Sequence, residues 1–277
     1  MSPVPPMRSL SALALSLVLA GPAVAGDAFI DRFDRLDGQR WTISNGWTNG
    51  AHMGCIWQRD EVSVGNGALY LRLTKTPTET DKGETRDYAC AEIQSRETYG
   101  FGLYEARIKA ARGSGLVSAF FTYTGPHLGD PHDEIDVEIL GRSMDEFDSN
   151  HFVAGKDQGA VKIPLAAPAD RSIIDYAFEW TPDALRWYVN GTLVREVTEG
   201  PMPEADQKIF FSIWNGGRGT TEWLGEPDPS IEWAAMMVDY VAYTPIGETC
   251  RFAGSASCSP NWEVRGTRAD EGESATQ

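Results

Sequence analysis

Once its first 25 residues are set aside, the chain has no hydrophobic run long enough to cross a bilayer. A membrane-spanning helix needs about 20 predominantly apolar residues, so we expect a soluble mature protein. Basic residues are also scarce, with 24 Lys and Arg against 40 Asp and Glu and a net charge of −16. This balance argues against nucleic acid as a partner, because its binders carry basic patches, and against adsorption to anionic lipid.

Several other signals are missing. No G-x-S-x-G, P-loop or dinucleotide-binding motif occurs, so the sequence gives no support for those enzyme classes. Long amphipathic helices are absent, and only residues 203–208 could form one helical turn. The four cysteines include no C-x-x-C pair, which makes zinc a weak alternative. An even number of cysteines indicates disulfides, and of three possible pairings the sequence order favours Cys55–Cys90 and Cys250–Cys258.

The first 25 residues are typical of an export signal. Arg8 is their only charge, an apolar run covers residues 10–20, and Ala23-Val24-Ala25 forms an A-x-A cleavage site. A buried N-terminal helix is the alternative. Cleavage near Ala25 would release a secreted or periplasmic protein, with one domain over residues 26–263 and a disordered polar tail over residues 264–277.

The mature chain has the pattern of an all-β protein. Short alternating apolar segments are separated by turn residues such as Asn66-Gly67 and Asn190-Gly191, and Asn-Gly is a strong hairpin signal. Many evenly spaced antiparallel strands predict a sandwich or jelly roll. The expected strands are residues 61–64, 68–74, 99–108, 118–124, 134–139, 176–180, 185–189, 192–197, 209–214 and 236–243.

One of these strands carries an unusual row of acids. From Glu134 to Ile139, acids alternate with Ile and Val, so the three acids share one face while the aliphatic side chains enter the core. Neighbouring acids on that face lie about 6.6 Å apart and repel one another. A solvated sheet face is the alternative interpretation, but such a face would include bases or Thr.

Paired carboxyls at this spacing suit glycoside hydrolysis. Glu134 and Glu138 have Cα atoms about 13 Å apart, and inward-leaning side chains bring their carboxyls to roughly 5 to 7 Å. This range includes the separation of retaining enzymes and the low end of that of inverting enzymes. The spacing therefore predicts a two-carboxylate hydrolase and leaves the stereochemistry open.

With its flanks, Asp133-Glu-Ile-Asp-Val-Glu138 resembles the catalytic strand of glycoside hydrolase family 16. The similarity extends over most of the mature chain and is greatest to the lichenase branch, the endo-1,3-1,4-β-glucanases. It is tighter still to the exopolysaccharide-trimming endoglycanases of rhizobia, which share Pro131-His132 and the C-terminal cysteine pair. Other matching segments are residues 47–50, 98–107, 118–126, 214–216 and 222–225.

The resemblance implies a β-jelly roll of two curved antiparallel sheets with a sugar-binding cleft on the concave side. It also implies a retaining mechanism, with Glu134 as nucleophile, Glu138 as general acid/base and Asp136 assisting the pair. This mechanism requires no cofactor. The expected reaction is hydrolysis of 1,3-1,4-linked β-glucan or a related bacterial exopolysaccharide by a protein that we expect to be a monomer.

Substrate contacts are also carried over from the family. The expected aromatic platforms are Phe121, Tyr123, Trp214 and Trp223, with core packing as the alternative for Phe121, and the expected polar contacts are Asn49, Glu92 and Asn150. His132 is a further expected substrate contact, although lichenases carry Trp at its position. Trp41, Trp57, Trp180 and Trp187 are expected in the core or in hairpins. The chain departs from lichenases at Gln94, His132, Phe152 and Ser212, where those enzymes carry Arg, Trp, Tyr and Asn, which puts the subsite preference in doubt.

Three further alternatives remain open. The family often holds a structural calcium, with Asp239 at the acidic ligand position, although an aspartate without metal at the core edge explains it too. A strict 1,3-glucanase (laminarinase) is the nearest enzymatic alternative, but that branch usually inserts a residue before the second Glu. A non-catalytic sugar-binding jelly roll is the other, and such modules often lose one catalytic Glu. Metal binding by His127, His132 and their neighbouring aspartates fits no ligand spacing, and turn residues explain them better.

Overall fold

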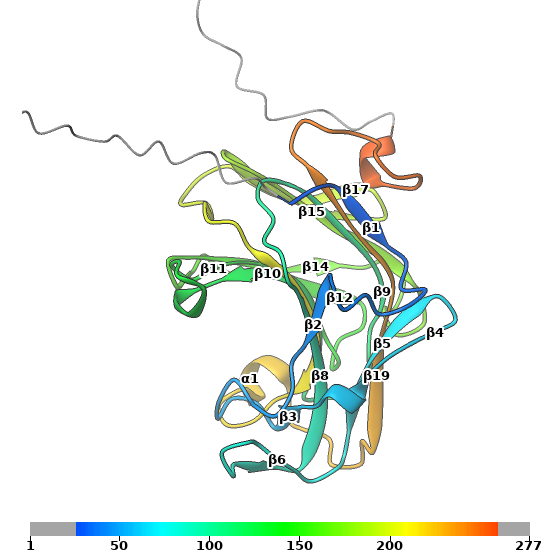
Figure 1. Ribbon diagram of the computed structural model, residues 1–277, viewed down its shortest axis with the longest axis vertical. Helices are drawn as coiled ribbons and strands as arrows, with labels where there is room; N and C mark the ends of the chain where they lie inside the picture. The colour runs from blue at the N-terminus through cyan, green and yellow to red at the C-terminus, as the bar shows by residue number, and fades with distance from the viewer. Residues whose placement is uncertain (1–25, 260–277) are drawn as a thin grey trace, which may run out of the picture.

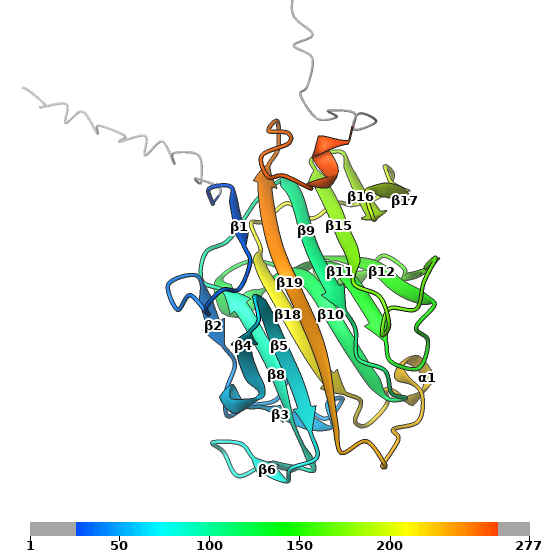
Figure 2. The same cartoon turned by 90° about the vertical axis from the view of Figure 1, so that its right-hand side faces the viewer.

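The computed structural model describes residues 26–259, which form two stacked β-sheets. The export signal and the polar tail that the sequence predicts both lie outside these residues. Figure 1 shows the two layers side by side, and Figure 2 shows the outer layer with β19, β9 and β15 in front of β18, β10 and β11. The described residues contain no helix long and apolar enough to cross a membrane. The all-β jelly roll expected from the sequence is confirmed.

The first layer, here called the cleft sheet, is antiparallel. Its strand order is β14–β12–β11–β10–β18–β8–β2, and β13 also pairs with β12. The strands are β2 (Trp41–Ile43), β8 (Tyr88–Ser95), β10 (Leu116–Thr124), β11 (Asp133–Leu140), β12 (Glu146–Val153), β13 (Lys156–Asp157), β14 (Val161–Pro164) and β18 (Lys208–Asn215).

The second layer, here called the outer sheet, has the order β4–β5–β19–β9–β15–β16–β17, and β1 also pairs with β19. Its strands are β1 (Phe29–Asp31), β4 (Val62–Gly65), β5 (Ala68–Thr74), β9 (Gly102–Lys109), β15 (Ile174–Thr181), β16 (Ala184–Val189), β17 (Thr192–Val197) and β19 (Trp233–Pro245). Strand β8 joins the layers, because it also pairs with β5 and runs parallel to β3 (Cys55–Trp57).

The remaining elements are short. Strands β6 (Thr78–Glu79) and β7 (Thr85–Arg86) form a small separate hairpin. One α-helical turn, α1, covers Thr221–Leu224, and three 3₁₀ turns cover Arg59–Glu61 (η1), Pro126–Leu128 (η2) and Ala256–Cys258 (η3). The chain is therefore organised almost entirely by strand pairing.

Aromatic side chains fill the space between the sheets. Phe120 of β10 stacks on Phe211 of β18 with ring centroids 5.0 Å apart, and it contacts Phe178 of β15 across the layers at 5.3 Å. All three side chains have 0% exposure. The four tryptophans expected in the core or in hairpins are buried as well: Trp41, Trp57, Trp180 and Trp187.

The two hairpins predicted from Asn-Gly turns are present in the structure. Asn66 and Gly67 have φ of 53° and 70°, and Asn190 and Gly191 have φ of 48° and 75°. Positive φ at both central residues is the type I′ geometry, which matches the twist of the flanking strands and favours Asn-Gly. The hairpins β4–β5 and β16–β17 therefore form where the sequence predicts them.

The helical turn expected at residues 203–208 is wrong. Gln207 exchanges both backbone hydrogen bonds with Tyr99, at 2.8 and 2.9 Å, which leaves neither group for a helix. The carboxylate of Asp133 accepts the backbone N–H of Glu204 at 3.0 Å and fixes the segment extended. The single α-helical turn of the described residues is α1 instead.

Both expected disulfides are present. Cys55–Cys90 joins β3 to β8, and both cysteines are fully buried. Cys250–Cys258 closes a small loop after β19. The described residues contain no free cysteine.

Candidate active site

Strand register aligns the cleft-facing side chains in rows across the cleft sheet. In one row Glu92, Ser212, Ala119, Glu138 and Asp148 lie opposite one another on β8, β18, β10, β11 and β12. Because side chains alternate along a strand, every second residue of these strands faces the same side. The row thus joins acids that are far apart in the sequence.

Two parallel rows flank the first. Asp136 lies between Phe121 of β10 and Asn150 of β12, and Glu134 lies between Tyr123 and Phe152 of the same two strands. Ile135, Val137 and Ile139 enter the core with at most 1% exposure. The alternation therefore places the three acids of β11 on the open face, as the sequence predicts.

A cavity of about 450 Å³ lies over these rows. Two small side chains, Ala119 and Ser212, separate Glu92 from Glu138 and leave room above the sheet. Most of the site residues predicted from the sequence line the cavity. Of the four positions that differ from lichenases, Gln94, His132 and Ser212 line it as well. These lining residues are Asn49, Glu92, Gln94, Phe121, Tyr123, His132, Glu134, Glu138, Ser212 and Trp214.

Four expected residues lie beside the cavity rather than along its wall. Asp136 is 3% exposed at the base of the row, and Asn150 is buried opposite it. Trp223 of α1 packs against Trp214, with ring centroids 5.8 Å apart. Phe152 stacks on the ring of His132 at 5.3 Å and is thus a second layer behind the wall.

Two acids of β11, Asp136 and Glu138, have raised pKa values. Burial raises the pKa of Glu138 to about 8, and the nearby carboxylates of Glu134, Asp148 and Asp157 add to this shift. Burial together with Glu134 and Glu138 holds the pKa of Asp136 well above its usual range. A buried carboxyl beside other acids is more stable when protonated, so Glu138 carries a proton near neutral pH.

Glu134 has a different environment. Its Oε2 lies 2.6 Å from Nε2 of His132, and this hydrogen bond raises the pKa of the imidazole. The His132 ring is held between Phe152 and Tyr123, whose centroid is 5.0 Å away. The backbone carbonyl of His132 accepts the N–H of Gly155 at 2.7 Å. His132 therefore holds the carboxyl of Glu134 from the side of the cleft.

Glu92 is the third acid that lines the cavity. It is 3% exposed and accepts a hydrogen bond from the Ser44 hydroxyl at 2.5 Å. Burial raises its pKa to about 7, against the lowering effect of that hydrogen bond. Glu92 can thus both donate and accept hydrogen bonds near neutral pH.

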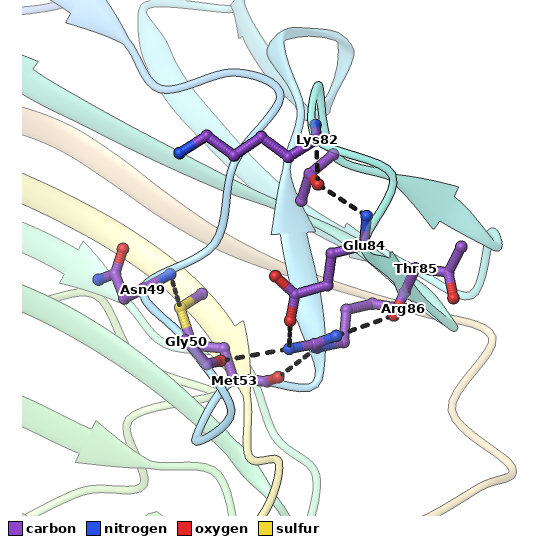
Figure 3. A network of polar contacts seen from close by, with 8 residues as sticks. Asn49, Gly50, Met53, Lys82, Glu84, Thr85 and Arg86 are labelled. Atoms are coloured by element: carbon purple, nitrogen blue, oxygen red, sulfur yellow. Dashed lines mark hydrogen bonds and ion pairs between the residues drawn. The ribbon is translucent and has the colours of Figure 1, made fainter.

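The loop that carries Asn49 is fastened by Arg86 of β7. The guanidinium donates from Nε to the carbonyl of Met53 at 2.9 Å and from Nη2 to the carbonyl of Gly50 at 3.5 Å (Figure 3). The Asn49 N–H contacts the Met53 sulfur at 3.4 Å. The Asn49 Oδ1 accepts the Trp57 indole N–H at 3.1 Å, which leaves the amide NH₂ of Asn49 as the group for a ligand.

Sequence reasoning missed four residues at the site. His52, His127 and Phe210 line the cavity, and Asp148 lies opposite Glu138. Phe210 follows from the alternation of Ile209 to Trp214, which leaves every second side chain on the cleft face. Strand β12, which carries Asp148, was not expected because polar residues interrupt its apolar alternation.

Asp239, the residue predicted as an acidic calcium ligand, lies beside a basic side chain. Asp239 lies at a register shift of β19, and its Oδ2 is 3.9 Å from the Arg107 guanidinium. The same guanidinium lies 3.6 Å from Asp175 Oδ1, so Arg107 is shared between two carboxylates. The described residues contain no group of three or more His, Cys, Asp or Glu gathered as metal ligands.

A larger cavity, of about 690 Å³, lies on the outer sheet near the C-terminal disulfide loop. Its buried acid, Glu105, accepts hydrogen bonds from the Ser255 hydroxyl and the Ala256 N–H, both at 2.7 Å. These bonds attach the loop to β9, so the acid has a structural role. The acids available for reaction with a ligand therefore lie in the cleft.

Comparison with known proteins identifies the class. The model of the glycosyl hydrolases family 16 matches residues 49–235, which include every acid of the rows. The sequence is 44% identical to an endo-1,3-1,4-beta-glycanase, ExoK, of Rhizobium meliloti over 83% of this chain and 84% of that protein. The protein is thus a glycoside hydrolase built on a β-jelly roll. The chain belongs to glycosyl hydrolases family 16.

Solved structures agree on the fold. The Bacillus licheniformis beta-glucanase superposes with a TM-score of 0.73 at 34% identity, covering 79% of this chain and 98% of that one. The catalytic domain of an endo-1,3-beta-glucanase (laminarinase) from Thermotoga petrophila gives 0.70 at 20% identity, covering 80% and 98%. The latter similarity shows the shared fold alone.

Proposed function

We propose that the protein is a retaining endo-β-glucanase that hydrolyses 1,3-1,4-linked β-glucan or a related bacterial exopolysaccharide. Glu134 would be the nucleophile and Glu138 the general acid/base, with Asp136 assisting. The observation that carries the proposal is the contrast between the two glutamates of one strand. Glu138 is partly buried with its pKa raised to about 8, while Glu134 is hydrogen-bonded to an imidazole in the same cavity.

The reaction follows from this contrast. A Glu134 oxygen forms a bond to the anomeric carbon while the glycosidic C–O bond breaks, and Glu138 gives its proton to the leaving oxygen. Glu138 is then a carboxylate and removes a proton from water, whose oxygen replaces Glu134 at the anomeric carbon. Both carboxyls return to their starting states, so no cofactor takes part.

Asp136 supports the cycle through its position between the two glutamates on the same strand face. A protonated Asp136 can donate a hydrogen bond to the Glu134 carboxylate, which orients the nucleophile without adding a charge. A neutral Asp136 also avoids a further negative charge beside the nucleophile.

The aromatic side chains would bind the sugar faces. Phe121, Tyr123 and Trp214 line the cavity, and Trp223 supports Trp214 from behind. Asn49 and Glu92 would bind hydroxyls on one side of the cleft. The Asn150 Oδ1 has no hydrogen-bond partner within the described part of the chain, which is consistent with a hydroxyl ligand.

The decisive experiment tests the two glutamates separately. Glu138→Ala should lose activity on polymer, and azide should restore turnover of a substrate with a good leaving group by forming a β-glycosyl azide. Glu134→Gln should be inactive while folding and binding sugar normally. Glu105→Gln is the matched control, since Glu105 is a buried acid of the outer sheet whose pKa burial also raises. An α-glycosyl azide from Glu138→Ala, or wild-type activity in Glu134→Gln, would refute the mechanism.

Substrate choice needs a parallel product analysis on lichenan, laminarin and an acidic exopolysaccharide. The mixed-linkage assignment predicts the highest kcat/KM on lichenan or on the exopolysaccharide. A preference for laminarin would instead favour the 1,3-glucanase alternative. Binding of all three without hydrolysis would favour the non-catalytic alternative.

We also infer export and a monomeric state. Both disulfides suit an oxidising compartment, and the sequence of residues 1–25 suits a cleaved signal. Mass spectrometry of the protein recovered from culture medium and periplasm should show a mature N-terminus near Gly26. Light scattering should give the mass of one chain.

A further inference from the structure

Asp148 is an acid of the cleft sheet to which the proposed mechanism gives no role. It lies on β12 directly opposite Glu138 of β11, in the same cross-strand row. Directly opposed side chains on one face of a sheet have Cβ atoms about 4.5–5.5 Å apart. Asp148 is 4% exposed, so its charge acts on Glu138 with little screening by solvent.

The two carboxylate oxygens of Asp148 have different partners. Oδ1 lies 3.2 Å from the Lys162 ammonium of β14, and Oδ2 accepts the Trp223 indole N–H at 3.2 Å. The Trp223 ring in turn contacts Trp214, which lines the cavity. Asp148 therefore connects the row of Glu138 to an aromatic wall of the cleft.

Lys162 partly balances the negative charge of Asp148. Its side chain is 48% exposed and also donates to Glu146 Oε1 at 3.0 Å, so it is shared between a buried and a more exposed acid. The Asp148 carboxylate is thus only partly neutralised. What remains of its charge contributes to the raised pKa of Glu138.

We propose that Asp148 is a positioning residue of the hydrolytic site, which favours the protonated form of Glu138 and holds Trp223 against the Trp214 platform. Lys162 sets how strongly the carboxylate acts on Glu138. This proposal rests on the acid/base role proposed for Glu138. The other ionisable groups around Glu138 are the acids Glu134 and Asp136 on β11 and Asp157 on β13. The wall of the same cavity adds Glu92, Tyr123 and three histidines, His52, His127 and His132.

The test is the pH dependence of kcat/KM in variants that change one charge at a time. Asp148→Asn keeps a side-chain oxygen for the Trp223 N–H but removes the charge, so the alkaline limb should move to lower pH by about one unit. Lys162→Met removes the opposing charge, so the alkaline limb should move to higher pH. Opposite shifts in the two variants are the signature of the proposed coupling.

Two further variants separate charge from shape. Glu105→Gln is the matched control, because it removes a buried acid of the outer sheet that does not line the cleft, and it should leave the alkaline limb at its wild-type position. Asp148→Leu removes both the charge and the acceptor for Trp223. It should raise KM by several-fold over Asp148→Asn, because the indole loses its hydrogen bond beside the platform.

The outcomes also separate this inference from the proposed function. If Asp148→Asn leaves the alkaline limb unchanged, or moves it in the same direction as Lys162→Met, the positioning role is wrong. If Glu138→Gln retains wild-type activity, the acid/base assignment itself is wrong. Lys162 is largely exposed, so its variant gives a readable profile even if a variant of buried Asp148 folds poorly.

Discussion

The two disulfides should differ in their contribution to stability, because they close loops of very different length. Cys55–Cys90 spans a sequence separation of 35 residues and joins β3 to β8, while Cys250–Cys258 spans 8 residues after the last strand. In the chain-entropy model the crosslink acts by restricting the unfolded chain, and longer loops lose more entropy.

The chain-entropy model gives the stabilisation expected from each disulfide. The longer loop corresponds to about 3.8 kcal/mol and the shorter loop to about 2.5 kcal/mol at 25 °C. Cys55 and Cys90 are also fully buried, so their replacement by alanine leaves a void that adds to the loss. For a domain of this size 1 kcal/mol corresponds to roughly 2–4 °C in Tm, so the longer crosslink should be worth about 8–15 °C.

The assay is urea and thermal unfolding of the paired variants Cys55→Ala/Cys90→Ala and Cys250→Ala/Cys258→Ala under oxidising conditions. The first pair should also lower activity near its new Tm, since β8 carries Glu92 of the cleft. The second pair should leave kcat unchanged at 25 °C, because its loop lies on the outer sheet.

Two results would refute the reasoning. A loss below about 1.5 kcal/mol for the first pair would mean that the reduced, unfolded chain keeps residual structure around β8. An equal or greater loss for the second pair would mean that the C-terminal loop stabilises the outer sheet by contacts rather than by loop closure.

Three more perturbations test the structure. His132→Phe should lose the hydrogen bond to Glu134, which raises the pKa of His132. The free energy of unfolding of the wild type should therefore exceed that of the variant by under about 1 kcal/mol below about pH 6.5, and this difference should vanish as the pH rises through the folded pKa. A pH-independent difference in urea unfolding would contradict this. Phe211→Ala should cost about 3–5 kcal/mol in chemical unfolding because the ring is fully buried, whereas a cost below 1 kcal/mol would place it outside the core. Calcium should leave the Tm of chelator-treated protein unchanged because Arg107 faces Asp239, and a rise of several degrees would show a cation site there.

Much of the fold follows from local signals in the sequence. The alternation from Glu134 to Ile139 places the acids on one face, because strand side chains alternate with period 2. Asn190-Gly191 places the β16–β17 hairpin, because Asn-Gly tolerates positive φ at both positions. Strands β8 and β12 were not found, because their cleft-facing positions carry polar side chains and their alternation is weak.

Residue roles around the acids depended on pairing between distant segments. No local pattern shows that Asp148 lies opposite Glu138, because the register of β12 on β11 is set by the whole sheet. His132 looks like a turn residue in the sequence, and only its packing between Tyr123 and Phe152 brings its Nε2 to Glu134.

By itself the sequence determined the class of fold and the strand that carries the three acids, and its order of cysteines favoured the pairing that the structure shows. These features are local or depend on residue type. Tertiary structure alone decided which neighbours surround each acid, and therefore which glutamate is held by a histidine and which is kept as a neutral carboxyl by desolvation and nearby acids. The physical reason is that burial and neighbouring charge set the protonation state, and both are properties of the packed sheet.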